Sequence, residues 1–264
     1  MRCKICGSSS LAWSKGRILQ KFIIQYFRCE QCGFIQTEEP YWLAESYAET
    51  IARSDIGIVS RNIGMSKLAR AIILSFFDCN ARFLDYGGGY GLLVRLMRDH
   101  GLDFYRYDKY TSNLFAKGFD AGKEGNKQYE LLTAFEVFEH LTSPLDEIME
   151  MFLYSDNILF STYLIPEPPP ALESWWYYSL DHGQHIALYT FRSLQVIAKK
   201  LNLKLYSNRK SFHLLTEKKL TQPAFRIISN RIVAQFVNSL LRIRLAHQSL
   251  LSSDFLDLTG KYIG

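Results

Sequence analysis

The sequence contains Phe83-Leu84-Asp85-Tyr86-Gly87-Gly88-Gly89-Tyr90-Gly91, and Leu92-Leu93-Val94-Arg95-Leu96-Met97 follows with helical spacing. An apolar run ends in an acid, and a glycine-dense turn leads into an amphipathic segment. This order predicts a strand, a tight loop and a helix. Glycine permits positive φ and lets a ligand lie against the backbone, and the first helical turn offers N–H groups to an anion. The stretch therefore predicts a ligand-binding loop in an α/β protein.

The spacing of the glycines separates this loop from the dinucleotide-binding motif G-x-G-x-x-G. Asp85, Gly87, Gly89 and Gly91 instead form Asp-x-Gly-x-Gly-x-Gly. In this pattern the chain resembles the class I S-adenosylmethionine (SAM)-dependent methyltransferases, over roughly residues 66–216. In that family the loop passes beneath the methionine part of the cofactor, so the resemblance implies that these four residues bind SAM. A glycine-rich turn in another α/β protein is the alternative.

A second acid follows the next predicted strand. Asp103 to Tyr107 alternates in polarity and ends at Asp108. In a βαβ unit, a carboxylate at the tip of the second strand can accept both hydroxyls of an adenosine ribose. An aspartate that caps a surface turn is the alternative. The resemblance further implies that Phe119 and Asp120, in the loop after a short third strand, contact the adenine ring.

The fourth predicted strand ends in a further motif. Glu136-Val137-Phe138-Glu139-His140, with Pro144 after it, resembles the Glu-Val-x-Glu-His-x-x-x-Pro signature of many small-molecule methyltransferases. The resemblance implies that Phe135, Glu136 and Val137 line the cofactor pocket. Glu139 and His140 would face the substrate or brace the loop. An imidazole is half neutral near pH ~6.5, so His140 is either a general base or a structural histidine bonded to the backbone.

An aromatic insertion follows the fifth strand and the proline-rich run 166–170. Aromatic faces stack on sugar rings and planar ligands, so this segment predicts the wall of an acceptor pocket, although packing in the core or at a dimer contact would also use such residues. His185 is the leading candidate for a base or substrate-orienting residue, and His182 is second. The predicted acceptor contacts are Trp175, Trp176, Tyr177 and Gln184.

Two cysteine pairs lie at the start of the chain, in Cys3-Lys4-Ile5-Cys6-Gly7 and Cys29-Glu30-Gln31-Cys32-Gly33. Each is a CxxC turn whose two thiolates converge on one ion. Four sulfurs form the closed tetrahedral site that structural Zn²⁺ prefers. We therefore predict a zinc ribbon in which Cys3, Cys6, Cys29 and Cys32 hold Zn²⁺ for folding rather than catalysis. An iron–sulfur cluster or a redox pair is the alternative.

Composition narrows the class of protein. The 264 residues are 48% hydrophobic and 22% charged, as in ordinary globular proteins. The net charge of +5 is compatible with an anionic substrate, but there is no long basic run, so we expect no nucleic-acid partner. We also expect no transmembrane segment, because no apolar run is long enough. Cysteines without a visible signal peptide favour a cytoplasmic protein.

Together these patterns predict an α/β fold. We expect a Rossmann-like seven-stranded methyltransferase sheet with helices on both faces, a small N-terminal zinc ribbon and a helical C-terminal extension. The expected parts are the zinc ribbon (1–40), a helical N-terminal segment (41–80), the SAM-binding methyltransferase domain (81–216, with an insertion at 164–189) and the helical C-terminal extension (217–264).

The amphipathic stretch 224–245 is expected to dock on the core or on a second subunit as a homodimer contact, and a membrane-surface helix is the alternative. The expected activity is SAM-dependent methylation of a small polar acceptor, a sugar or a cell-surface polysaccharide precursor, at oxygen rather than carbon. The alternative is a non-catalytic methyltransferase-like scaffold that contacts a partner through its ribbon. The intact Asp85 loop and Asp108 argue against that alternative.

Overall fold

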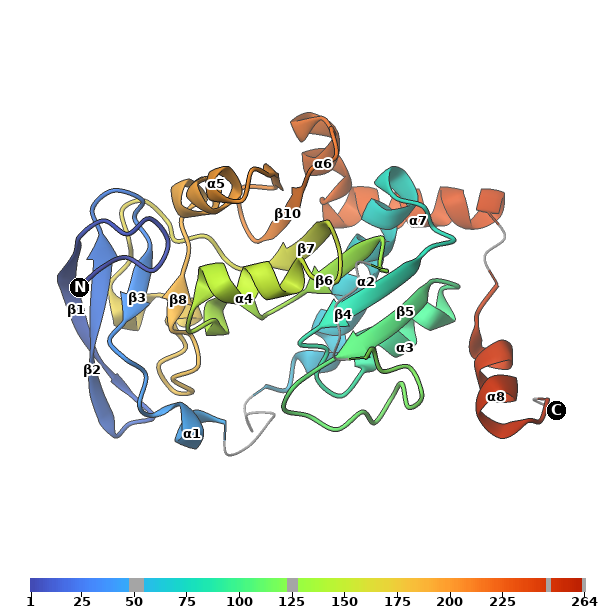
Figure 1. Ribbon diagram of the computed structural model, residues 1–264, viewed down its shortest axis with the longest axis horizontal. Coiled ribbons are helices and arrows are strands. Elements are labelled where there is room, and N and C mark those ends of the chain that lie inside the picture. Colours follow the sequence, from blue (N-terminus) through green and yellow to red (C-terminus); the bar gives the residue numbers. More distant parts are fainter. Residues whose placement is uncertain (48–54, 123–127, 246–247, 263–264) are drawn as a thin grey trace. The chain divides into compact units, whose positions relative to one another are not determined.

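The computed structural model describes residues 1–47, 55–122, 128–245 and 248–262 (Figure 1). The chain forms two compact units. Unit 1 comprises Met1–Asp55, Glu136–Met149 and Phe160–Glu217, and unit 2 comprises Ile56–Phe135, Glu150–Leu159 and Lys218–Gly264.

The secondary structure mixes strands and helices (Figure 1). The strands are β1 (Ser10–Ile18), β2 (Phe22–Cys29), β3 (Ile35–Thr37), β4 (Arg82–Tyr86), β5 (Asp103–Tyr107), β6 (Leu131–Ala134), β7 (Asn157–Ser161), β8 (Ala187–Leu188), β9 (Lys204–Ser207) and β10 (Phe212–Thr216). The α-helices are α1 (Leu43–Ser46), α2 (Ile58–Phe76), α3 (Leu92–Asp99), α4 (Pro144–Met151), α5 (Phe191–Lys200), α6 (Gln222–Ile228), α7 (Arg231–Leu245) and α8 (Leu251–Thr259). Short 3₁₀ turns span Phe138–His140, Leu172–Ser174 and Trp176–Tyr178.

The larger sheet has the strand order β5-β4-β6-β7-β10-β9. β4 pairs in parallel with β5 and with β6, and β9 and β10 form an antiparallel hairpin. Four consecutive β4 residues, Phe83 to Tyr86, are buried, as expected for a parallel strand covered on both faces. In the sheet, β5 lies on one side of β4 and β6 lies on the other, so the strand order reverses at β4. Open α/β sheets bind ligands at the carboxyl ends of the strands at such a reversal.

The sheet has six strands in the described part of the chain, whereas seven were expected. In place of the short third strand, the structure has a single parallel bridge between Arg106 and Asp120. The Arg106 N–H donates to the Phe119 carbonyl (2.8 Å) and the Ala121 N–H donates to the Arg106 carbonyl (2.7 Å). The ladder is limited to these bonds because the preceding residues, 109–118, form turns rather than an extended segment.

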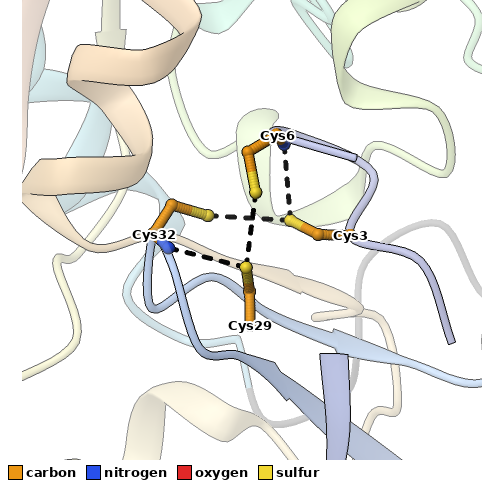
Figure 2. A group of neighbouring side chains, drawn as sticks. All are labelled: Cys3, Cys6, Cys29 and Cys32. Carbon is orange, nitrogen blue, oxygen red and sulfur yellow. Dashed lines mark hydrogen bonds between the residues drawn. The ribbon is translucent and has the colours of Figure 1, made fainter. Parts of the chain in front are cut away.

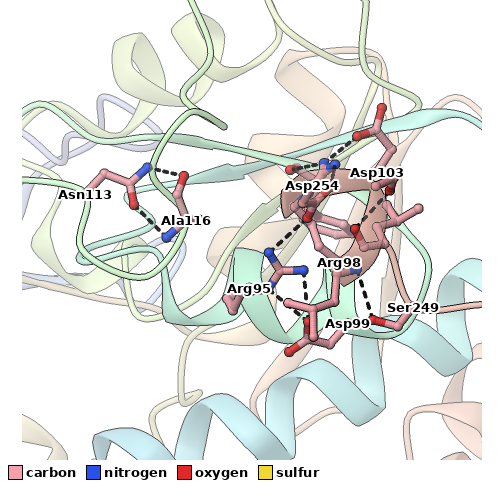
Figure 3. Close-up of polar contacts among 12 residues, drawn as sticks. Arg95, Arg98, Asp99, Asp103, Asn113, Ala116, Ser249 and Asp254 are labelled. Atoms are coloured by element: carbon pink, nitrogen blue, oxygen red, sulfur yellow. Dashed lines mark hydrogen bonds and ion pairs between the residues drawn. The ribbon is translucent and has the colours of Figure 1, made fainter. Parts of the chain in front are cut away.

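The helices of unit 2 pack against one another. α2 contacts α3, α6 and α7, and Arg70 of α2 reaches the side-chain oxygen of Asn238 on α7 (3.3 Å). Asp254 of α8 accepts hydrogen bonds from the Arg98 guanidinium of α3 at 2.6 and 2.9 Å (Figure 3). Both of these side chains are almost fully buried. The helices after β10 therefore contact α2 and α3 within the same chain. Of the predicted helical segment 41–80, residues 48–54 lie outside the described residues.

Unit 1 contains the smaller sheet, with the order β1-β2-β3-β8. β1, β2 and β3 belong to the predicted ribbon, whereas β8 comes from the end of the insertion 164–189 and pairs antiparallel with β3. One hydrophobic core joins the two segments. From the ribbon side it contains Ile18, Ile24, Tyr26, Ile35 and Trp42, and from the insertion Ile165, Leu172, Tyr177, Tyr178, Ile186 and Leu188. The predicted four-part division stays a prediction.

Among the described helices, none is both long and apolar enough to cross a bilayer.

Candidate functional site

The glycine loop after β4 has the backbone that its sequence requires. Gly87, Gly89 and Gly91 adopt φ values of +69°, +53° and +87°, a region that residues with a Cβ rarely occupy. Gly91 is also the residue from which α3 starts, and a Cβ there would lie 2.7 Å from Oδ1 of Asn113. The loop therefore tolerates no larger residue at these positions without strain, and Gly89 is the position where an added Cβ would meet no described atom within 4 Å.

Asp85 lies beneath this loop. Its Oδ1 accepts a hydrogen bond from the Thr133 hydroxyl (2.7 Å), and a Cβ on Gly88 would lie 2.8 Å from its Oδ2. Burial raises the pKa of Asp85 to about 7, and the Thr133 hydrogen bond opposes this shift. The carboxyl thus supports the loop from below, and its predicted contact with SAM stays a prediction.

Asp108 holds the loop from the side. Its Oδ2 accepts the Gly89 N–H (2.9 Å), and its Oδ1 accepts the N–H groups of Tyr110 (2.8 Å) and Thr111 (2.7 Å). A carboxylate has about four acceptor positions, so about one remains for a ligand hydroxyl. Asp108 therefore joins the glycine loop to the end of β5, where a ribose contact was predicted.

Arg106 connects segments around this loop and was not among the predicted site residues. Its guanidinium is buried, and it donates to the Gly89 carbonyl (2.6 Å), to Oγ1 of Thr111 (3.0 Å) and to Asp120 (2.7 Å). Three segments around the loop thus meet at one side chain. The available signal was a basic residue at an inward-facing position of β5.

The two predicted adenine contacts have partners inside unit 2. The Phe119 ring is buried beneath the Arg98 guanidinium, 3.7 Å from its centroid. The Asp120 carboxylate pairs with Arg106 and also accepts the Asn113 amide (3.0 Å). Their contact with adenine stays a prediction.

Glu136 has an unusual backbone conformation for a side chain of its size, with φ +55°. Its N–H donates to the Ser161 hydroxyl (2.9 Å), and that hydroxyl donates back to Oε1 of Glu136 (2.7 Å). Ser161 thus fixes this turn after β6. Phe135 and Val137, on either side, are half-buried, so the role of all three in the cofactor pocket remains a prediction.

The structure brings Glu139, His140 and His185 together. One donor atom from each lies within 4.8 Å of the other two. The imidazole rings of the two histidines meet edge to face, 5.0 Å between centroids. Nδ1 of His140 is 2.8 Å from the Tyr47 hydroxyl, and Nδ1 of His185 is 2.6 Å from the Tyr177 carbonyl oxygen. Residues from three distant parts of the sequence therefore form one polar cluster.

Burial favours the neutral forms of His140 and Glu139. It lowers the pKa of His140 to about 3, and the neighbouring His185 ring adds to the effect. Burial also raises the pKa of Glu139 to about 8, and the charge of Glu136 acts in the same direction. An imidazole with so low a pKa takes up a proton poorly at neutral pH.

The other predicted acceptor contacts have varied surroundings. Tyr177 is fully buried and its hydroxyl bonds the Thr162 hydroxyl (3.1 Å). The Gln184 amide donates to the Ser46 carbonyl (2.7 Å). Trp175 is half-buried, whereas Trp176 is 68% exposed. His182 is half-buried and lies outside the cluster of Glu139 and the two histidines.

The four predicted metal ligands also lie together (Figure 2). The Sγ atoms of Cys3 and Cys32 are 3.6 Å apart and those of Cys6 and Cys29 are 3.4 Å apart. Four sulfurs at ~2.3 Å from one Zn²⁺ would be about 3.8 Å apart, so the cluster has the size of a tetrahedral zinc site. Gly7 and Gly33 complete the two turns with positive φ.

The arrangement around these sulfurs supports a thiolate site. The N–H groups of Ile5 and Cys6 point at Sγ of Cys3 (3.4 and 3.5 Å), and the N–H of Cys32 points at Sγ of Cys29 (3.5 Å). Such donors stabilise sulfur charge. The Thr190 hydroxyl, at the start of α5, donates to the Cys32 carbonyl (2.6 Å). The residues therefore fit a structural Zn²⁺, and its presence stays a prediction.

A family model described as a methyltransferase domain matches residues 62–208, more than half of the chain. No curated protein matches the sequence.

Several solved structures align with part of this chain. CalO1, titled a methyltransferase in calicheamicin biosynthesis in its SAH-bound form, has a TM-score of 0.44 at 15% identity over 67% of this chain and 60% of CalO1. The plantazolicin methyltransferase BpumL, in complex with SAH, has a TM-score of 0.44 at 11% sequence identity, and the match covers 68% of this chain and 95% of BpumL. The magnesium protoporphyrin IX methyltransferase ChlM from Synechocystis PCC 6803 has a TM-score of 0.39 at 12% sequence identity, and the match covers 66% of this chain and 90% of ChlM. The chain spans only 59% of TnmH and 60% of CalO1.

Proposed function

Because this chain belongs to the methyltransferase-domain family, we propose that it is a SAM-dependent methyltransferase acting on a small polar acceptor, a sugar or a cell-surface polysaccharide precursor. The observation that carries this proposal is the loop from Gly87 to Gly91, held by Asp108. Its three positive-φ glycines open the backbone to the cofactor, and the acid beside them has acceptor capacity left for a ribose hydroxyl.

The reaction needs little beyond positioning. The acceptor oxygen attacks the methyl carbon of the sulfonium, the carbon–sulfur bond breaks, and its electron pair stays on sulfur. The products are a methyl ether and S-adenosylhomocysteine (SAH), and the hydroxyl proton must leave. The positive sulfonium already activates the methyl group, so most of the catalysis would come from holding the two reactants in line. A carbon nucleophile is the less favoured version.

Three histidines are available on the acceptor side. His185 is the leading candidate to prepare the acceptor oxygen, followed by His140 and His182. The position of His185 supports this order, because its ring is held by the Tyr177 carbonyl and faces the ring of His140. A histidine in a fixed orientation and tautomer is suited to act on a hydroxyl.

The acceptor class is supported by the insertion and by charge. Trp176 is exposed and offers an aromatic face of the kind on which sugar rings stack. The net charge of +5 favours acceptors that carry phosphate, such as nucleotide-linked sugars. A cytoplasmic location and a homodimer formed through the C-terminal helices remain predictions.

The proposal is tested by incubating the full chain with methyl-labelled SAM and a set of nucleotide-linked sugars. We expect label in at least one sugar, and His185→Ala should lower turnover while SAM affinity stays near that of the unaltered protein. If His185→Ala abolishes SAM binding instead, this residue belongs to the cofactor site and the acceptor assignment is wrong.

A further inference from the structure

We propose that Glu139, His140 and His185 form a second metal site, which takes a divalent transition-metal ion such as Zn²⁺. Among the described residues there are two groups whose donor atoms lie close enough together to share an ion, and the other is the four-cysteine cluster. The donor atoms of Glu139 and the two histidines are all within 4.8 Å of one another. Ligands at ~2.0–2.2 Å from one ion are about 3.4 Å apart in a tetrahedral site, so small side-chain rotations complete the geometry.

The Glu139 carboxyl is the strongest sign that a cation belongs here. Its side chain has no exposed surface, and among the described residues neither of its oxygens has a partner at hydrogen-bond geometry. The hydroxyls of Tyr177 and Thr162 bond to each other (3.1 Å), and both lie close enough to the Glu139 carboxyl to lower its pKa. One hydroxyl proton of this pair is left to act on two carboxyl oxygens, and a buried carboxyl is unfavourable unless donors or a cation satisfy it. A bound ion would satisfy both oxygens at once or bind one and polarise the other.

The His185 ring is already oriented as a metal ligand. Its Nδ1 lies 2.6 Å from the Tyr177 carbonyl oxygen, which can only accept, so Nδ1 carries the proton and the lone pair is on Nε2. Metal-ligating histidines usually donate their second ring N–H to a carbonyl or carboxylate in this way. Nδ1 of His140 lies 2.8 Å from the Tyr47 hydroxyl, which can accept or donate, and the tautomer with the proton on Nδ1 leaves Nε2 as a ligand.

The donor set selects the kind of metal. Two imidazole nitrogens and one carboxylate are ligands typical of Zn²⁺ and its first-row neighbours, whereas Mg²⁺ and Ca²⁺ prefer oxygen alone. Three protein ligands also leave a coordination position open, in contrast to the closed four-cysteine site. The second site therefore has the ligand count of a catalytic metal.

The open position gives the ion a role, and this step rests on the proposed function. An ion held by Glu139, His140 and His185 would supply Lewis acidity at this position: it would lower the pKa of an acceptor hydroxyl bound there, so that the hydroxyl proton could pass to water. The oxygen then attacks the methyl carbon, and the carbon–sulfur electron pair remains on sulfur. In this arrangement His140 and His185 prepare the acceptor by holding the ion rather than by taking the proton.

The test is the number of metal ions that the full chain holds after equilibration with Co²⁺ and removal of unbound metal. We expect two per chain. One should show the sulfur-to-metal absorption of a thiolate site, and the other only the weak visible bands of a nitrogen and oxygen site. Glu139→Gln and His185→Ala should each lose the second ion and keep the first, whereas His182→Ala, outside the cluster, should keep both.

Finding only one ion in the unaltered chain would overturn the proposal. Finding two ions in His185→Ala would also overturn it. The metal site and the proposed function can also be disproved independently of each other. Methyl transfer by protein that holds only the thiolate-bound ion would disprove the second site and leave the methyltransferase assignment standing. Two bound ions in protein with no affinity for SAH would disprove the methyltransferase assignment and leave the second site standing.

Discussion

Asp85 couples folding to pH through a single buried carboxyl. Burial raises its pKa from an ordinary 3.8 to about 7. Between these two values the unfolded chain releases a proton that the folded chain keeps, so this residue's contribution to stability falls as pH rises from about 4 to about 7. Asp85→Asn removes the titration and keeps an oxygen that can accept the Thr133 hydroxyl.

We therefore expect the free energy of unfolding of Asp85→Asn, relative to the unaltered protein, to rise by up to about 4 kcal/mol between pH 4 and pH 7. Denaturant unfolding at several pH values measures this difference, and comparison of the two proteins cancels the titration of all other groups. A difference that does not change with pH would mean that Asp85 is not a buried titrating acid.

Gly91 allows a direct test of the loop's backbone. Its φ is +87°, and a Cβ would meet Asn113 at 2.7 Å. Gly91→Ala should therefore reduce the free energy of unfolding by about 1–3 kcal/mol and weaken SAH binding. Gly64→Ala is the matched control, because Gly64 lies within α2 and a Cβ there meets nothing within 4 Å.

Gly64→Ala should raise the free energy of unfolding by about 0.5–1 kcal/mol, because alanine is more stable than glycine within a helix. Thermal or denaturant unfolding of the two variants checks both signs. Equal effects at the two positions would contradict the strained backbone assigned to Gly91.

At the scale of elements, the ribbon and the insertion depend on each other. β8 pairs with β3, and Tyr177 and Tyr178 share a core with Tyr26 and Trp42. Chelation of the predicted Zn²⁺ should therefore release residues 172–188 together with residues 1–40. Amide hydrogen exchange with and without chelator measures this, and loss of protection confined to residues 1–40 would contradict the shared core.

α8 is held by a buried ion pair (Figure 3). Asp254 bonds the Arg98 guanidinium at 2.6 and 2.9 Å, and Arg95 also contacts it at 2.9 Å. Removing one partner of a buried pair leaves the other charge uncompensated, so Asp254→Ala should reduce the free energy of unfolding by about 3–5 kcal/mol. Asp257→Ala, exposed on the same helix, should have little effect in the same denaturant titration. Similar losses in both variants would show that the pair does not anchor α8.

For the whole molecule, features formed by residues close together in the sequence could be predicted, whereas contacts between residues far apart in the sequence could not. The strand–loop–helix around Asp85 and the two CxxC turns involve near neighbours, so local patterns predicted them. The pairing of Leu188 with Ile35 has no local signal, because each residue alone is one more apolar strand position. The same holds for the meeting of Glu139 with His185, and for Arg106, whose three partners come from different loops. The third strand was predicted from its place in the family pattern, but in the described part of the chain its pairing with β5 is limited to one bridge.

Calorimetric titration of the metal-loaded protein with SAH tests the methyltransferase assignment. We expect binding with a dissociation constant of about micromolar, near −8 kcal/mol. Asp108→Ala should bind at least about tenfold more weakly, since it loses both the ribose acceptor and the contact that fixes Gly89. No binding by well-folded protein that retains its thiolate-bound metal would contradict the methyltransferase assignment and favour a non-catalytic scaffold.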